Sequence, residues 1–317
     1  MREGEGGRLA VVDAARGVAV AAMIVFHTAW DLSFLRLIAT PVGTDPAWQA
    51  FAMGIAGSFL ALVGVGLVLA HGRVLRPRAF LRRLATVALA ALAVTGATWL
   101  AFPESFIYFG ILHMITLGSV LALPFLRAPL PLVVAAAAVV LALPWFVRFP
   151  ALDGRAFGWI GLSADVPPSN DFEPLFPWLA PVLVGVALAR IVLASRWREP
   201  LAAWRPRGAV GRGLARAGRW SLVIYLVHQP ILLGVLYPVA GVLGPNPAAQ
   251  AAGFLRSCKA GCAGQGRDAR TCRAACACVL DRATAEGLRE ALVTDGLAPE
   301  GLARVQEMGR ACFRERR

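Results

Sequence analysis

Long apolar blocks constrain this chain more than any other feature. Seven of them run for about 18–23 residues each, at 17–37, 48–70, 84–102, 107–126, 130–147, 175–195 and 220–243. An α-helix of about 20 apolar residues crosses the hydrocarbon core of a bilayer. Only 16% of the residues are charged, and the mean hydropathy is +0.63. The sequence therefore predicts an all-α, polytopic membrane helix bundle with about seven spans, and it excludes a disordered chain.

The arginines set the orientation of these spans. The net charge is +13, and arginines gather in the segments 71–83 and 196–219, whereas acids outnumber arginines between the fifth and sixth blocks. Positively charged loops stay in the cytoplasm, so the N-terminus is expected inside and, after seven spans, the C-terminus outside. A basic chain can also bind nucleic acid, but arginines in short loops between apolar blocks indicate contact with membrane lipid and no nucleic-acid partner. We expect a multi-pass protein of the inner (plasma) membrane.

The segment after the last block differs in composition and is expected to form a second domain, 244–317, beside a membrane domain at 1–243. It contains all six cysteines: Cys258, Cys262, Cys272, Cys276, Cys278 and Cys312. An extracytoplasmic (periplasmic) tail favours disulfides, with a metal site as the alternative. Two C-x3-C pairs, each on one helix face, suggest a helical hairpin closed by Cys258–Cys276 and Cys262–Cys272, with Cys278–Cys312 closing the rest. Six cysteines can pair in many ways, so spacing alone does not decide.

Ionisable side chains form a polar line along the first block. At 3.6 residues per turn, Arg16 and His27 lie on one helix face; Asp13 stands three residues before Arg16, and Asp31 stands four after His27. Asp13 can pair with Arg16, and Asp31 can orient the His27 ring and raise its basicity. Ionisable groups are costly inside a membrane and mark functional sites. The alternative is interfacial side chains at both ends, with one hydrogen-bonded histidine between them.

Other polar side chains are candidate site residues on the outer or the cytoplasmic side of the membrane. On the outer side they are Glu104, His113, Asp171, Glu173 and His228. For the two histidines the alternative is a hydrogen bond between helices, and for the acids it is a solvated loop. On the cytoplasmic side Arg73 and Arg76 are orientation signals first and phosphate-binding candidates second.

Five sequence blocks resemble a known family. VDAARGVAVAAMIVFH, in which D-x-x-R-G precedes a histidine, is similar to the first span of the transmembrane acyltransferases, which include the acyltransferase-3 proteins. FHTAWDLSF, PESFIYFGILHMI, DFEPLFPW and GRWSLVIYLVHQP resemble, in this order, blocks of the small prokaryotic branch of the heparan-α-glucosaminide N-acetyltransferase family. The resemblance covers about residues 8–240.

The resemblance implies an integral-membrane acyltransferase. Its donor would be acetyl-CoA, used from the cytoplasm, and its acceptor an amino or hydroxyl group of an extracytoplasmic glycan or sugar-lipid. By the match, Arg16 would hold the donor and His27 would be the catalytic base. The residue pattern adds Asp13, Arg73 and Arg76 as donor-side candidates and Asp31 as the residue that orients His27. The alternatives are a proton-coupled transporter or channel, and a non-catalytic anchor that displays the cysteine-rich tail to a periplasmic partner.

The topology can be tested with reporter fusions. Fusions after Leu126, Ser195 and Ala248 should report a cytoplasmic, a cytoplasmic and an extracytoplasmic position, because the arginine-rich segments remain inside. A cytoplasmic reporter at Ala248 would contradict both the span count and the disulfide argument.

Overall fold

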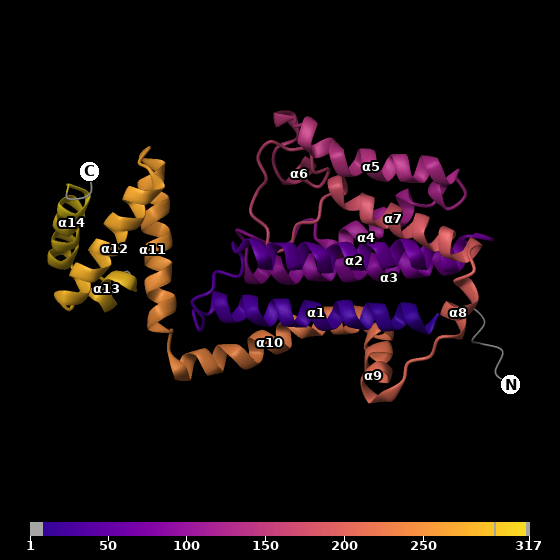
Figure 1. Ribbon diagram of the computed structural model, residues 1–317, viewed down its shortest axis with the longest axis horizontal. Coiled ribbons are helices and arrows are strands. Elements are labelled where there is room, and N and C mark those ends of the chain that lie inside the picture. The colour runs from indigo at the N-terminus through magenta and orange to yellow at the C-terminus, as the bar shows by residue number, and fades with distance from the viewer. Residues whose placement is uncertain (1–8, 295, 315–317) are drawn as a thin grey trace. The chain divides into compact units, whose positions relative to one another are not determined.

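The computed structural model describes residues 9–294 and 296–314, which are almost entirely helical (Figure 1). Within these ranges there is no β-strand, only an isolated bridge between Phe109 and Phe172. The long helices are α1 (Ala10–Phe34), α2 (Pro46–His71), α3 (Pro77–Ala101), α4 (Ile111–Leu121), α5 (Leu130–Phe146), α7 (Leu175–Ala194), α9 (Gly208–Arg219), α10 (Ser221–Leu243), α11 (Pro247–Gly264), α12 (Ala269–Ala285) and α14 (Pro299–Arg314). The short ones are η1 (Pro124–Leu126), η2 (Pro150–Leu152), α6 (Arg155–Gly158), α8 (Arg198–Ala203) and α13 (Arg289–Val293).

The apolar blocks are helices, as predicted, but they differ in length. Among the described residues, five helices are long and apolar enough to cross a membrane: α1, α2, α3, α7 and α10. The helix α5 has 17 residues, and α4 has only 11. The block 107–126 was expected to be one continuous span. Its helix instead begins at Ile111, because Gly110 is extended and Phe109 bridges to Phe172.

The short α4 still joins the two ends of the bundle. At one end, the Arg127 guanidinium donates a hydrogen bond to the carbonyl of Arg73 (3.2 Å), which ties the turn after α4 to the segment after α2. At the other end, the Arg155 guanidinium donates to the carbonyl of Glu104 (2.9 Å). These contacts join neighbouring loops at each end of the helices. Five described helices are long enough to span, so the expected count of seven spans stays a prediction.

The residue contacts divide the chain into two compact units. The first comprises Met1–Val25 and Ala50–Gln229, and the second comprises Phe26–Gln49 and Pro230–Arg317. The helices α1 and α10 each contribute residues to both units. The domain boundary expected between 243 and 244 lies inside the second unit, in the turn from α10 to α11.

Glycines allow close helix packing in the first unit. A Cβ at Gly64 of α2 would overlap the carbonyl oxygen of Val182 in α7, and a Cβ at Gly185 of α7 would overlap that of Ala61 in α2. In lipid there is no hydrophobic driving force between helices. Small residues let their backbones approach closely enough for packing contacts to hold them together. The fully buried Leu60 and Leu183 fill the space beside this crossing.

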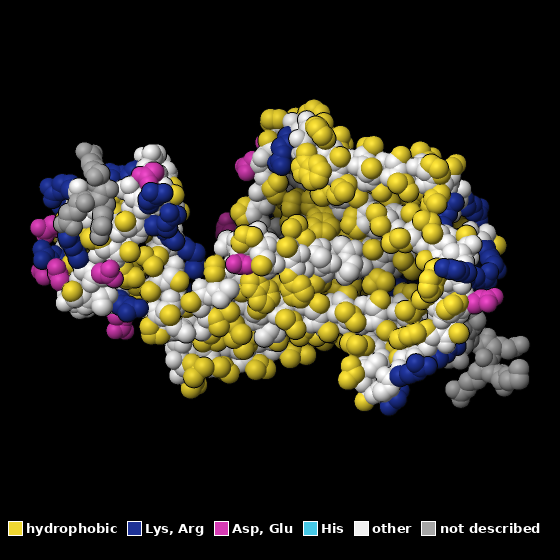
Figure 2. Space-filling model, viewed as in Figure 1, with side chains coloured by type: hydrophobic (Ala, Val, Ile, Leu, Met, Phe, Trp, Pro, Cys, Tyr) yellow, Lys and Arg dark blue, Asp and Glu magenta, His cyan; other side chains and the backbone are white. Residues whose placement is uncertain are grey.

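The surface of the first unit suits a lipid environment. Hydrophobic side chains cover the helices, and arginine side chains gather over the end that carries α8 and α9 (Figure 2). Large aromatic side chains are exposed at the helix ends: Trp99 and Trp145 on one side, Trp197 and Trp220 on the other. Tryptophan favours both membrane–water interfaces. Together with the long apolar helices, these features describe a multi-pass membrane protein.

The tail is a helical module closed by three disulfides. Cys258–Cys276 and Cys262–Cys272 join α11 to α12, and Cys278–Cys312 joins α12 to α14. These are the pairings that the C-x3-C pattern suggested, and all six cysteines are bonded. The core beside them is small, with Val279, Ala283 and Met308 buried.

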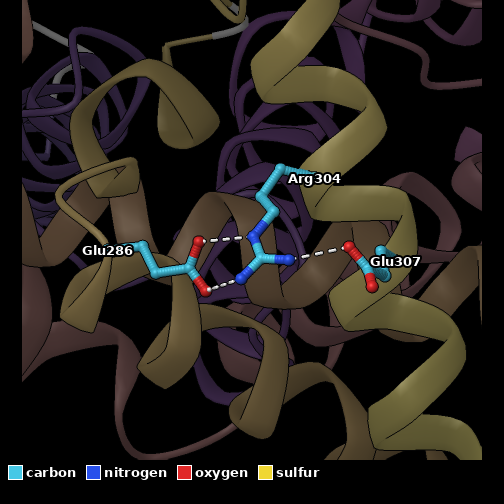
Figure 3. A network of polar contacts seen from close by, with 3 residues as sticks. All are labelled: Glu286, Arg304 and Glu307. Atoms are coloured by element: carbon cyan, nitrogen blue, oxygen red, sulfur yellow. Dashed lines mark hydrogen bonds and ion pairs between the residues drawn. The ribbon is translucent and has the colours of Figure 1, made fainter.

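Polar contacts on the tail surface add to these links. Figure 3 shows Arg304 of α14 between two acids: its guanidinium makes two hydrogen bonds to Glu286 (2.7 and 3.0 Å) and one to Glu307 (2.7 Å). The side chain of Asp268 caps α12 by accepting the N–H groups of Arg270 and Thr271, 2.9 Å away. These exposed contacts contribute little stability each, so the disulfides carry the fold of this module.

Removing one disulfide measures that contribution. Replacing both Cys278 and Cys312 by Ser should lower the free energy of unfolding of the tail by about 2–5 kcal/mol, because α14 loses its covalent tie to α12. Thermal unfolding of the purified protein with and without the substitutions, with Ser257→Ala as a surface control, gives the difference. Thiol labelling of the denatured, unreduced wild-type protein should find no free cysteine; stoichiometric labelling would contradict the disulfides.

Candidate functional site

One large cavity lies wholly within the first unit. Its volume is 870 Å³, and α1, α2, α3, α4, α9 and α10 all contribute to its wall. One end is lined by arginines: Arg16, Arg76, Arg83 and Arg219. Its apolar wall includes Phe59, Val63, Ile111, Leu112 and Leu222, and the polar groups Ser221 and Tyr225 also line it. Cavities of about 300–1,000 Å³ with mostly apolar walls and a few polar groups hold small molecules.

Two guanidinium groups converge inside the arginine-lined end. A Cβ built on Gly66 of α2 would lie 3.1 Å from Nη2 of Arg16 and 3.7 Å from Nη1 of Arg83. Arg16 forms an ion pair with Asp13 (3.5 Å). Among the described residues, no carboxylate forms an ion pair with Arg83. Two like charges at this distance repel unless an anion lies between them, and guanidinium groups match phosphate oxygens in two-point hydrogen bonding.

Arg83 is a site residue that the sequence interpretation missed. It was counted among the orientation arginines of the segment 71–83. In the structure α3 already begins at Pro77, so Arg83 is a helical residue that lines the cavity. The i, i+7 spacing from Arg76, which also lines the cavity, was the available signal. Arg73 is exposed and does not belong to the wall.

The helix α9 closes the cavity beside α1. A Cβ at Gly17 would overlap the carbonyl of Leu214, and a Cβ at Gly218 would overlap the carbonyl of Asp13. The two backbones therefore touch, and this contact brings Arg219 to the wall. Arg212 and Arg216 of the same helix are exposed. In Figure 1, α9 crosses the direction of α2 and α3, as expected for a helix between two spans.

A carboxyl pair lies directly behind Tyr225. The Tyr225 hydroxyl donates to Oδ2 of Asp171 (3.4 Å), which also accepts the N–H of Ile111 at the start of α4 (3.0 Å). Gly110 is required here, because a Cβ would overlap the Asp171 carboxylate. The backbone of Glu173 donates to the carbonyl of Phe109 (3.1 Å). Its Oε2 is buried and has no hydrogen-bond partner.

Burial perturbs both acids of this pair. It raises the pKa of Asp171, and the hydrogen bonds from Ile111 and Tyr225 oppose that rise. Burial, and then the nearby charge of Asp171, raises the pKa of Glu173 to about 9. Glu173 is therefore protonated at neutral pH, beside the charge of Asp171.

The two outer histidines are held in hydrogen bonds. Nδ1 of His113 accepts the N–H of Gly110 (3.2 Å), so its Nε2 carries the proton and donates to Thr95 (3.2 Å), whose hydroxyl donates to Ile107. His228 is buried, and its Nδ1 donates to the carbonyl of Tyr225 (2.7 Å). Both rings thus lie near the carboxyl pair, in fixed orientations.

The remaining candidates are separated from this cluster. Glu104 is exposed, and only its carbonyl is engaged, by Arg155. Asp13 is buried and lines the cavity with Arg16. His27 and Asp31 belong to the second unit, where Asp31 is fully buried and His27 half-buried. Their catalytic roles stay predictions.

The described residues contain no group of three His, Cys, Asp or Glu side chains that could hold a metal ion. The charged groups of the site are arginines, which can bind an anion, and carboxyl groups, which can exchange protons.

Comparison with known proteins adds one match. The family model described as heparan-alpha-glucosaminide N-acetyltransferase, catalytic, matches residues 8–230. This range includes every residue that lines the cavity and leaves out the cysteine-rich tail. No curated protein and no solved structure matches the chain.

Filling the arginine-lined end should block anion binding. In Gly66→Leu the added side chain would occupy the space between Arg16 and Arg83, so the affinity for coenzyme A should fall at least about tenfold. The control is Gly54→Leu on the same helix, where a Cβ meets nothing within 4 Å. Isothermal titration of the purified proteins measures both; equal affinities would place the anion elsewhere.

Proposed function

The chain belongs to the heparan-alpha-glucosaminide N-acetyltransferase catalytic family, and on that premise we propose that it moves an acetyl group across the membrane. The donor would be acetyl-CoA, bound from the cytoplasm. The acceptor would be an amino or hydroxyl group of an extracytoplasmic glycan or sugar-lipid. The observation that carries this proposal is the 870 Å³ cavity, with arginines at one end and a carboxyl pair behind Tyr225.

The arginine-lined end suits the phosphates of the donor. Arg16 and Arg83 would hold the diphosphate between them, and Arg76 and Arg219 offer further positive charge. The ion pair with Asp13 fixes Arg16, so less conformational entropy is lost when the anion binds. The apolar wall beyond would cover the pantetheine arm and exclude water from the thioester.

His27 is the proposed base. It lies on the same helix as Arg16, and Asp31 follows it by one turn, as an orienting carboxylate should. The base would take a proton from the attacking nitrogen or oxygen as this atom bonds to the acyl carbon. The carbon–sulfur bond breaks, and the sulfur leaves with the electron pair as the thiolate of coenzyme A.

The outer loops would receive the acceptor. Asp171, Glu173, His113 and His228 meet near the start of α4, and Glu104 lies in the adjoining loop. With the N-terminus inside, this end faces the periplasm, and so does the tail, whose three disulfides require an oxidising compartment. A periplasmic tail on an inner-membrane enzyme would be accessible to a periplasmic partner.

Transfer by the purified protein tests this function. With acetyl-CoA and glucosamine, wild-type protein should form N-acetylglucosamine and free coenzyme A. His27→Ala should reduce kcat about 10²–10⁴-fold, because a general base is lost, with donor affinity retained. Arg83→Ala should raise the KM for acetyl-CoA. Arg82→Ala is the matched control, since Arg82 is the neighbouring arginine that does not line the cavity.

Three results would contradict the proposal. If the wild-type protein releases no coenzyme A with any amino or hydroxyl sugar, a transporter or an anchor replaces the enzyme. If His27→Ala keeps its turnover, another residue is the base. If Arg82→Ala and Arg83→Ala raise the KM equally, the effect is one of net charge and not of the cavity.

A further inference from the structure

We propose that Tyr225 relays a proton from the cavity to the Asp171–Glu173 carboxyl pair, and that this pair is the proton acceptor on the outer side of the reaction. The inference rests on the proposed acyl transfer, but it concerns residues that the family match does not assign. Tyr225 connects the cavity to Asp171, and Asp171 acts on the substrate only through Tyr225.

The first support is the position of Tyr225. It lines the cavity, and its hydroxyl donates to Asp171. Asp171 does not line the cavity itself. A proton that leaves a group inside the cavity can therefore reach the carboxyl pair by entering the Tyr225 hydroxyl, whose own proton passes on to Oδ2 of Asp171.

The second support is that the carboxyl pair is built into the fold. Oδ2 of Asp171 is fixed by Ile111 at the start of α4, and Gly110 leaves room for it. Oε2 of Glu173 is buried without a hydrogen-bond partner. Such an atom costs free energy of folding, and a functional role would explain why the fold retains it. Among the described residues, no arginine or lysine forms an ion pair with either acid. Asp153, in the same loop region, has a structural role instead. Its carboxylate accepts two backbone N–H groups, from Ala164 (2.7 Å) and Asp165 (2.9 Å).

The third support is that Asp171 is the carboxyl group that the Tyr225 hydroxyl contacts, whereas the neighbouring titratable groups make other contacts. From α4, His113 uses both ring nitrogens in hydrogen bonds. From α10, His228 donates its Nδ1 proton to the carbonyl of Tyr225 and not to its hydroxyl. From the loop before α4, Tyr108 packs its ring on Phe172, and its hydroxyl has no partner. Burial raises the pKa of Asp171, which favours its taking a proton from the Tyr225 hydroxyl, and the protonated Glu173 lies in the same buried region.

The step balances as follows for an amine acceptor, R–NH3⁺. One N–H bond breaks, and its proton passes through the Tyr225 hydroxyl to the carboxylate, leaving R–NH2 with a free electron pair. That pair bonds to the acyl carbon, the carbon–sulfur bond breaks, and the thiolate leaves. A general base takes the second proton from the nitrogen and returns it to the thiolate. The carboxyl pair then releases its proton to the outer solution.

Tyr225→Phe tests the relay, because it removes only the hydroxyl. With acetyl-CoA and glucosamine, kcat should fall about 10²-fold, while the KM for acetyl-CoA stays within a factor of two. The substitution also removes a hydrogen bond that favours ionised Asp171, so the pKa of Asp171 should rise. The midpoint of its carboxyl band in infrared spectra, assigned with Asp171→Asn, should move to higher pH.

Matched variants separate the relay from a structural role. Tyr108→Phe removes a buried hydroxyl from the same region and should change neither kcat nor the infrared midpoint. Asp171→Asn keeps the shape but removes the proton acceptor, so it should lower kcat with an unchanged KM, even if Tyr225→Phe fails to fold. The inference is overturned if Tyr225→Phe or Asp171→Asn keeps wild-type kcat, or if Tyr108→Phe is equally impaired. These results would leave the acyltransferase standing, whereas an inactive wild-type protein would remove the function itself.

Discussion

A guanidinium group inside a membrane domain needs an anion or water, and this requirement organises the first unit. Arg16 has Asp13 beside it, but Arg83 faces Arg16 and makes no ion pair among the described residues. Burying such a charge in lipid is costly, so the helices around it leave a cavity that water or a ligand can fill. The cavity is thus the consequence of placing two arginines on facing helices.

Close backbone contacts make this arrangement possible. Gly17 and Gly218 bring α9 against α1, and Gly64 and Gly185 bring α2 against α7. In lipid, helices associate through such packing and not through the hydrophobic effect. The contact between α9 and α1 holds Arg219 at the cavity. The contact between α7 and α2 supports α2, and Gly66 of α2 leaves space for the arginines. A larger side chain at any of these glycines would separate the helices that form the wall.

The sequence predicted much of the fold because lipid imposes simple rules on length and charge. The apolar blocks are helices, and the two C-x3-C pairs suggested two of the disulfides, with the two remaining cysteines forming the third. The start of α4 was not predictable, because hydropathy continues through Ile107 and Phe109 and only a distant contact with Phe172 stops the helix there. The inward direction of Arg83 and the role of Tyr225 were also missed. Helices that are apolar on every side give no signal of which face meets a neighbour.

The two ends of the site suit the charges of the two proposed substrates. The donor would carry its negative charge on phosphates at the arginine-lined end, and an amine acceptor would bring its positive charge to Asp171, which Tyr225 connects to the cavity. The acetyl group is neutral, so its transfer would do no work against the membrane potential. Of the two protons that the amine would lose, the one that passes through Tyr225 and Asp171 would return to the outer solution. The other would move inward to the thiolate, the direction that an inside-negative potential favours by up to about 2.3 kcal/mol per 100 mV for a full crossing. Separate paths for the two protons would therefore let the potential assist the transfer.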